Sequence, residues 1–114
     1  MKQIAEFTIV GRVGKVKPGN ALRVTIASNY RFPDQTNEWK DDTHWNEVTV
    51  FNKARAAEIE ESVGPGDLVE VRGRLRQGSY KRQDGSTAYT VDLIATRFEL
   101  KAKAESRARE KEAA

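Results

Sequence analysis

Two aromatic side chains with strand spacing could bind a flat ligand in this chain. They are Trp45 and Phe51, within the segment Thr-His-Trp-Asn-Glu-Val-Thr-Val-Phe at residues 43–51. Side chains alternate between the two faces of a strand, so both rings would share one face and Val48 and Val50 the other. Nucleic-acid bases stack on exposed rings regardless of sequence. The segment predicts either a stacking surface or, if both faces are covered, a pair of core aromatics.

A second group of rings and cations lies in residues 29–42, which read as a long polar connection. Connections of this length in a compact domain are uncommon and are often functional. The rings either contact a ligand or hold the connection against its own domain. The candidate ligand-binding residues of this segment are Tyr30, Arg31, Phe32, Trp39 and Lys40.

Residues 67–77 alternate cleanly and place a row of arginines on one face of a strand. These residues are Arg72, Arg74 and Arg76, and they could bind phosphate or simply form the solvated outer face of an antiparallel sheet. The next segment, 77–87, is typical of a hairpin that ends at Asp-Gly. Its expected tip mixes a ring with cations, namely Tyr80, Lys81 and Arg82.

The elements that must position these residues follow from hydrophobic periodicity. A helix is expected over 52–62, capped by Asn52 and ended by Gly-Pro-Gly at 64–66. A bend or bulge is expected near Gly11 and Gly14, and a turn over 15–20. The order predicts an all-β fold, a five-stranded Greek-key barrel of the OB type with the helix between the third and fourth strands. The strands are expected at 4–13, 22–28, 43–51, 67–77 and 88–98.

Composition limits the classes of protein that fit. At 114 residues the chain makes one domain, and with no cysteine it has neither disulfides nor thiol chemistry. No apolar run is long enough to span a membrane, so we expect a cytoplasmic protein without membrane contact. Residues 1–100 are expected to form the domain. Residues 101–114 carry five cations and three anions without a large apolar residue, which predicts a charged helical or disordered tail.

Several stretches together resemble the bacterial single-stranded DNA-binding protein family. They are Ile-Val-Gly-Arg-Val-Gly at 9–14, Thr-His-Trp at 43–45 with Val-Thr-Val-Phe-Asn-Lys at 48–53, and Gly-Asp-Leu-Val-Glu-Val-Arg-Gly-Arg-Leu-Arg at 66–76. Tyr89 and Thr90 extend the match into the last strand. The resemblance covers about residues 4 to 100 and implies an OB fold that binds single-stranded DNA.

The resemblance also implies roles for residues and an assembly. It implies that DNA stacks on Trp45, Phe51, Tyr80 and a position near Tyr30, and that the protein is a homo-oligomer, with a tetramer favoured over a dimer. Asn46 replaces a histidine that the family links to subunit association. The family ends in an acidic Asp-Asp-hydrophobic-Pro-Phe tip that recruits replication and repair enzymes, whereas this chain ends Arg-Glu-Lys-Glu-Ala-Ala. The resemblance therefore predicts either a specialised version without that recruitment or a truncated chain.

We expect a non-enzymatic protein that binds single-stranded DNA with little sequence preference during replication, recombination or repair. We expect no cofactor and no metal, because the single histidine, His44, has no cysteine partner and the pairs Asp41-Asp42 and Glu60-Glu61 are typical of solvated positions. A metal-dependent nuclease would need carboxylates that converge in a cleft. Two other interpretations stay open: an RNA-binding or replication-accessory OB domain, and a protein-interaction OB module whose aromatic face is an interface.

Overall fold

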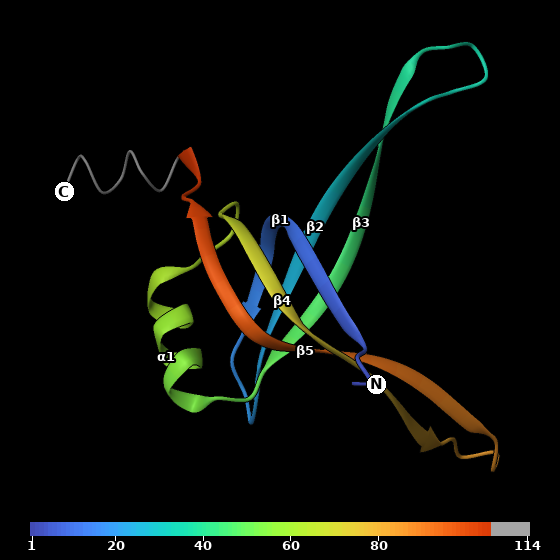
Figure 1. The fold of residues 1–114 in the computed structure, drawn as a ribbon, viewed down its shortest axis with the longest axis vertical. Coiled ribbons are helices and arrows are strands. Elements are labelled where there is room, and N and C mark those ends of the chain that lie inside the picture. Colours follow the sequence, from blue (N-terminus) through green and yellow to red (C-terminus); the bar gives the residue numbers. More distant parts are fainter. Residues whose placement is uncertain (106–114) are drawn as a thin grey trace.

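The computed structural model describes residues 1–105 and folds them into a closed barrel of five strands with one helix (Figure 1). Around the barrel the strands follow the order β1-β2-β3-β5-β4. Neighbouring strands are antiparallel except for β3 and β5, which are parallel. This confirms the predicted OB barrel. The elements are β1 (Glu6–Lys17), β2 (Leu22–Pro33), β3 (Trp39–Val50), α1 (Lys53–Ser62), β4 (Leu68–Lys81) and β5 (Thr87–Ala102).

The core fills the barrel with branched aliphatic side chains, which suit a pleated, buried surface. Each strand places alternate residues inward, as the period of two requires. The predicted inward positions of β3 and β4 are confirmed, because Val48, Val50, Val69 and Val71 are all buried. Phe98 from β5 and Ile59 from the helix complete the core.

The helix begins and ends where the sequence predicts. The Asn52 side chain accepts a hydrogen bond from the Arg55 backbone N–H at 3.0 Å and so caps the first turn. Ile59 is the buried residue of the helix, which closes one end of the barrel. The chain then turns through Gly66, whose φ of 86° favours glycine.

The prediction of a long loop at 29–42 is wrong. Those residues extend β2 and β3 into a paired hairpin with register from Asn29 opposite Thr43 to Pro33 opposite Trp39, and only residues 34–38 lie between the strands. Figure 1 shows this hairpin projecting from the barrel, and we call it the β2–β3 arm. Both of its faces lie outside the core. Its sequence therefore lacks the apolar alternation that marks a half-buried strand.

Other strands are also longer than expected. β1 continues to Lys17 through a register shift between Val13 and Val16, so the bulge is confirmed, but residues 15–17 are strand and not turn. The hairpin predicted at 77–87 is confirmed as a second projecting arm, the β4–β5 arm. The predicted tail begins inside β5, and because residues 106–114 lie outside the described residues, the tail stays a prediction. Within residues 1–105, no helix is long and apolar enough to cross a membrane.

Candidate nucleic-acid interface

The two rings that the sequence singles out on β3 both face solvent. Trp45 is 61% exposed and Phe51, just after the strand, is 55% exposed. Both lie on the outer face of the sheet formed by β2, β3 and the end of β1, while their neighbours Val48 and Val50 point into the core. The core interpretation of these rings is therefore wrong for the single chain.

Trp45 lies directly against a glycine on β1. A Cβ placed on Gly14 would come within 2.5 Å of Trp45 Cζ3 and 2.9 Å of Thr25 Oγ1. The β1 bulge brings Gly14 opposite Thr25, whose hydroxyl accepts a hydrogen bond from the Lys15 backbone N–H at 2.8 Å. The absence of a side chain at Gly14 therefore lets the indole lie against the backbone of β1.

A methyl group at Gly14 should displace this indole. In Gly14→Ala we expect the Trp45 indole N–H resonance to move in a ¹H–¹⁵N spectrum, while the Trp39 resonance stays in place, because overpacking forces the ring from its seat. Gly19→Ala is the matched control, since its nearest contact would be the Ala21 carbonyl oxygen at 3.5 Å. If the Trp45 and Trp39 indole resonances move equally, or if neither moves, the contact between Trp45 and Gly14 is contradicted.

Cations border both rings. A groove of about 560 Å³ beside Trp45 is lined by Lys15 and Lys17. A second groove, of about 520 Å³ beside Phe51, is lined by Lys17 and Arg23. Rings beside cations are the combination that binds single-stranded nucleic acid. We call this surface the platform, and its members are Lys15, Lys17, Arg23, Trp45, Glu47 and Phe51.

The β2–β3 arm divides its predicted residues between two faces. Residues that pair across antiparallel strands share a face, so Arg31, Trp39 and Trp45 lie on the platform side. Tyr30, Phe32 and Lys40 lie on the opposite side. The structure therefore does not bring the arm residues into one cluster, although all of them remain exposed.

Contacts within the arm hold these rings. Arg31 lies over the Trp39 ring at 5.7 Å from its centroid, and Tyr30 packs edge-on against His44 at 5.2 Å between centroids. A cation over an indole face is attracted by the ring quadrupole. The rings therefore pack on their own arm and not on the barrel, and Trp39 keeps 63% of its surface exposed.

The tips of both arms are held by aspartates. Asp34 accepts hydrogen bonds from the Thr36 hydroxyl at 2.7 Å and from two backbone N–H groups, and these bonds lower the pKa of its carboxyl, with the Thr36 hydroxyl the largest cause. Asp84 does the same with Ser86, whose hydroxyl is the main cause of its lowered pKa. Both carboxylates therefore stay charged to lower pH than free aspartate.

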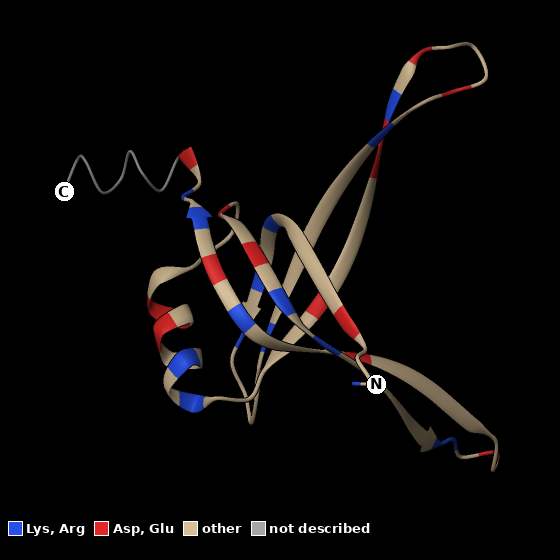
Figure 2. Cartoon of the chain, viewed as in Figure 1, with Lys and Arg blue, Asp and Glu red and all other residues tan. Residues whose placement is uncertain are grey.

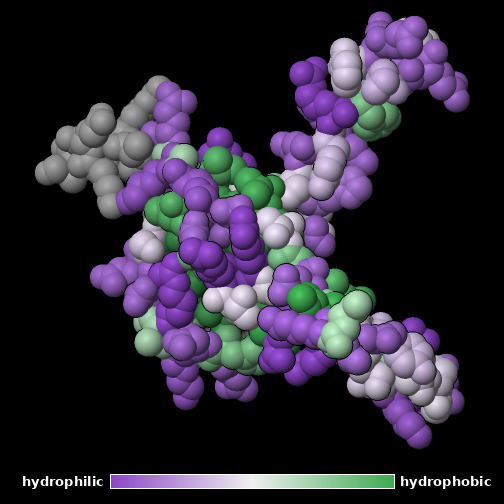
Figure 3. Space-filling view, viewed as in Figure 1, coloured by the Kyte–Doolittle hydropathy of each residue, from purple (hydrophilic) through white to green (hydrophobic). Residues whose placement is uncertain are grey.

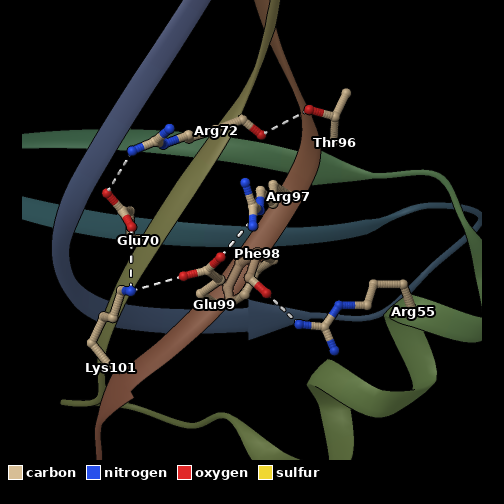
Figure 4. Close-up of polar contacts among 8 residues, drawn as sticks. All are labelled: Arg55, Glu70, Arg72, Thr96, Arg97, Phe98, Glu99 and Lys101. Carbon is tan, nitrogen blue, oxygen red and sulfur yellow. Dashed lines mark hydrogen bonds and ion pairs between the residues drawn. The ribbon is translucent and has the colours of Figure 1, made fainter.

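The predicted arginine row lies on a different wall of the barrel from the platform, because β4 borders β1 and β5 and neither β2 nor β3. Figure 4 shows that Arg72 reaches Glu70, at 3.4 Å, and that Lys101 joins Glu70 to Glu99. Lys101 lowers the pKa of Glu99, and Glu99 raises that of Lys101. Figure 2 shows both signs of charge along β4 and β5, so this wall is not a purely basic surface.

The rest of the row leads into the β4–β5 arm. Arg76 pairs with Asp92 at 3.3 Å, whereas Arg74 makes no ion pair within residues 1–105. Tyr80, 56% exposed, shares the arginine face, while Lys81 lies on the other face opposite Thr87. Arg82 is in the turn, where its backbone N–H donates to the Ser86 carbonyl oxygen. Hydrophilic residues predominate on both arms in Figure 3.

Sequence reasoning missed several residues that border the rings. Lys15, Lys17 and Arg23 line the platform. The signal for the lysines was present, because Lys15 and Lys17 alternate after Gly14 as a continuing strand would. A turn limited to Pro18-Gly19 would have left Lys15 and Lys17 in the strand, beside Gly14.

Two of the carboxylates considered for catalysis, on the β2–β3 arm, are engaged in ion pairs. Asp41 contacts Arg31 at 3.4 Å, and Asp42 contacts His44 at 2.7 Å, all on the β2–β3 arm. Within the described part of the chain, no three histidine or acidic residues gather in a group that could hold a metal ion. The geometry of the site is that of a binding surface made of rings and cations.

Comparisons with known proteins agree with this geometry. The mitochondrial single-stranded DNA-binding protein of Saccharomyces cerevisiae is 31% identical over 97 residues, covering 79% of this chain and 67% of that protein. The single-stranded DNA-binding protein of Xanthomonas campestris is 30% identical over 105 residues, covering 85% of this chain and 60% of that protein. This chain thus spans roughly half to two thirds of the curated relatives it matches.

Comparison of the fold with solved structures also finds a single-stranded DNA-binding protein. A crystal structure of the S. cerevisiae mitochondrial protein superposes with a TM-score of 0.70 at 27% identity, covering 90% of this chain and 100% of that one. The family model described as the single-strand binding protein family matches residues 4–101, which is most of the chain. The chain therefore belongs to the single-strand binding protein family.

Proposed function

We propose that this protein binds single-stranded DNA with little sequence preference and protects it during replication, recombination or repair. The observation that carries the proposal is the exposed Trp45 ring, seated on Gly14 and bordered by Lys15 and Lys17. Membership of the family supports it. Duplex DNA keeps its base faces stacked, so a ring platform favours single strands.

Two terms supply the affinity. Each stacked base contributes about 1–3 kcal/mol, and each neutralised phosphate makes the logarithm of the affinity fall with the logarithm of the salt concentration by about 0.7. Trp45 and Phe51 provide the central stacking sites, and Trp39, Tyr30, Phe32 and Tyr80 extend binding onto the arms. The cations proposed for phosphate contacts are Arg31, Lys40, Arg72, Arg74, Arg76, Lys81 and Arg82, together with the platform lysines and Arg23.

The direct test is a tryptophan fluorescence titration with oligo(dT), a duplex and an RNA strand of equal length, at two salt concentrations. We expect quenching by oligo(dT) that weakens with salt, and little response to the duplex. Equal or tighter binding of RNA would replace the DNA proposal by the RNA-binding interpretation. If none of the three nucleic acids quenches the tryptophan fluorescence, the proposed binding of single-stranded DNA is overturned.

We also propose a homo-oligomer, with a tetramer favoured over a dimer. Apolar side chains exposed away from the platform support an interface, since Val10 is 51% exposed and Tyr89 and Val91 are 68% exposed. Sedimentation equilibrium should give a multiple of the 12.8 kDa chain mass. If Trp45→Ala dissociates the oligomer and costs little DNA affinity, the platform is a protein interface instead. The cytoplasmic location stays a prediction from the sequence.

A further inference from the structure

One acidic residue lies on the platform between its two rings. Glu47 follows Trp45 by two positions and precedes Phe51 by four, so all three share the outer face of the sheet. Glu47 also lines the groove beside Trp45. A phosphate backbone that joins bases on the two rings must therefore pass close to a carboxylate.

Glu47 holds the cations that such a backbone would need. Its Oε2 contacts Lys17 Nζ at 2.5 Å, and its Oε1 lies 3.8 Å from Arg23 Nη1. Lys17 lines the grooves beside both rings, and Arg23 lines the one beside Phe51. In the free protein, one carboxylate thus pairs with two of the three platform cations.

These ion pairs are open to exchange. The side chains of Lys17, Arg23 and Glu47 are 48%, 61% and 36% exposed, and ion pairs between exposed side chains are weak. A phosphate oxygen can therefore take the place of the carboxylate. Glu47 nevertheless opposes that exchange in two ways, because it competes for the cations and it repels the incoming anion.

We propose that Glu47 is a built-in competitor of DNA phosphate for Lys17 and Arg23, and that it lowers both the affinity for single-stranded DNA and the salt dependence of binding. The proposal rests on the proposed function. Binding replaces the Lys17–Glu47 and Arg23–Glu47 pairs by phosphate contacts and leaves Glu47 without them. The platform consequently binds more weakly and releases DNA more readily than its rings and cations alone would.

The test is Glu47→Gln, which keeps the shape of the side chain and removes its charge. We expect about three- to tenfold tighter binding of oligo(dT) at low salt. We also expect a salt slope more negative by up to about 0.7, because the carboxylate that binding frees in the unaltered protein takes up a salt cation and so offsets part of the counterion release, whereas glutamine does not. Glu58→Gln is the matched control, because Glu58 is also ion-paired, to Arg55 at 2.7 Å on α1, and carries the same charge. It should change binding less than twofold.

A coupling experiment separates competition for these two cations from a general effect of charge. In a Lys17→Gln, Arg23→Gln background, the gain from Glu47→Gln should be smaller than in the unaltered protein, since the cations it competes for are gone and only its repulsion of the anion remains. A full gain in that background, or equal effects of Glu47→Gln and Glu58→Gln, would overturn the inference alone. Failure of the unaltered protein to bind oligo(dT) would instead remove the proposed function and this inference with it.

Discussion

Replacing Trp45 by alanine should weaken binding of oligo(dT) by about 5- to 150-fold, the equivalent of the roughly 1–3 kcal/mol that one stacked base contributes. Folding stability should change little, because the ring is 61% exposed and the core below it stays intact. Fluorescence anisotropy of a labelled strand measures the affinity. Trp39, the other tryptophan of the chain, remains available to report on the protein itself.

Trp45→Phe is the matched control for this result. It keeps an aromatic face on the Gly14 seat and should retain most of the affinity. The salt slope should be unaltered in both variants, because neither removes a phosphate contact. An alanine variant that binds as tightly as the unaltered protein would contradict stacking at this ring. An alanine variant with a changed salt slope would indicate that the platform cations have also moved.

Replacing Asp67 by alanine should lower the free energy of unfolding by about 2–4 kcal/mol. Asp67 is fully buried, and its carboxylate accepts from the Gly64 N–H at 3.0 Å and from the Ala104 N–H at 2.8 Å. Its own backbone carbonyl accepts from the Val13 N–H at 2.9 Å. The side chain thus ties the turn before β4 to the segment after β5, and alanine leaves a buried N–H of Gly64 without its acceptor.

Urea unfolding followed by far-ultraviolet circular dichroism measures this loss. Asp67→Asn is the control, because its single amide oxygen can keep one of the two bonds and should give an intermediate loss. The slope of stability against urea should be equal in all three proteins, since the folded state stays the same size. A loss below about 0.5 kcal/mol in the alanine variant would show that water replaces the carboxylate at both N–H groups.

Where one face of an element meets the core, its sequence was sufficient to predict it. The alternation of Val69 and Val71 with charged residues gave the path of β4, and Asn52 followed by helix formers gave α1. The same reasoning failed at residues 29–42, where both faces of the arm are exposed and no burial imposes a pattern. There the strands are held by backbone pairing, which any residue except proline can supply.

Taken alone, the sequence determined the OB barrel, the resemblance to the family, and the presence of rings and cations at strand spacing, because burial and motif order follow from residue types. Only the tertiary structure decided how those residues are combined. It put Trp39 and Tyr30 on opposite faces of one arm and placed the arginine row on another wall. It also set Gly14 under Trp45 and joined Lys17 to Glu47. Such contacts depend on register and on the β1 bulge, and shifting a strand by one residue would exchange every face.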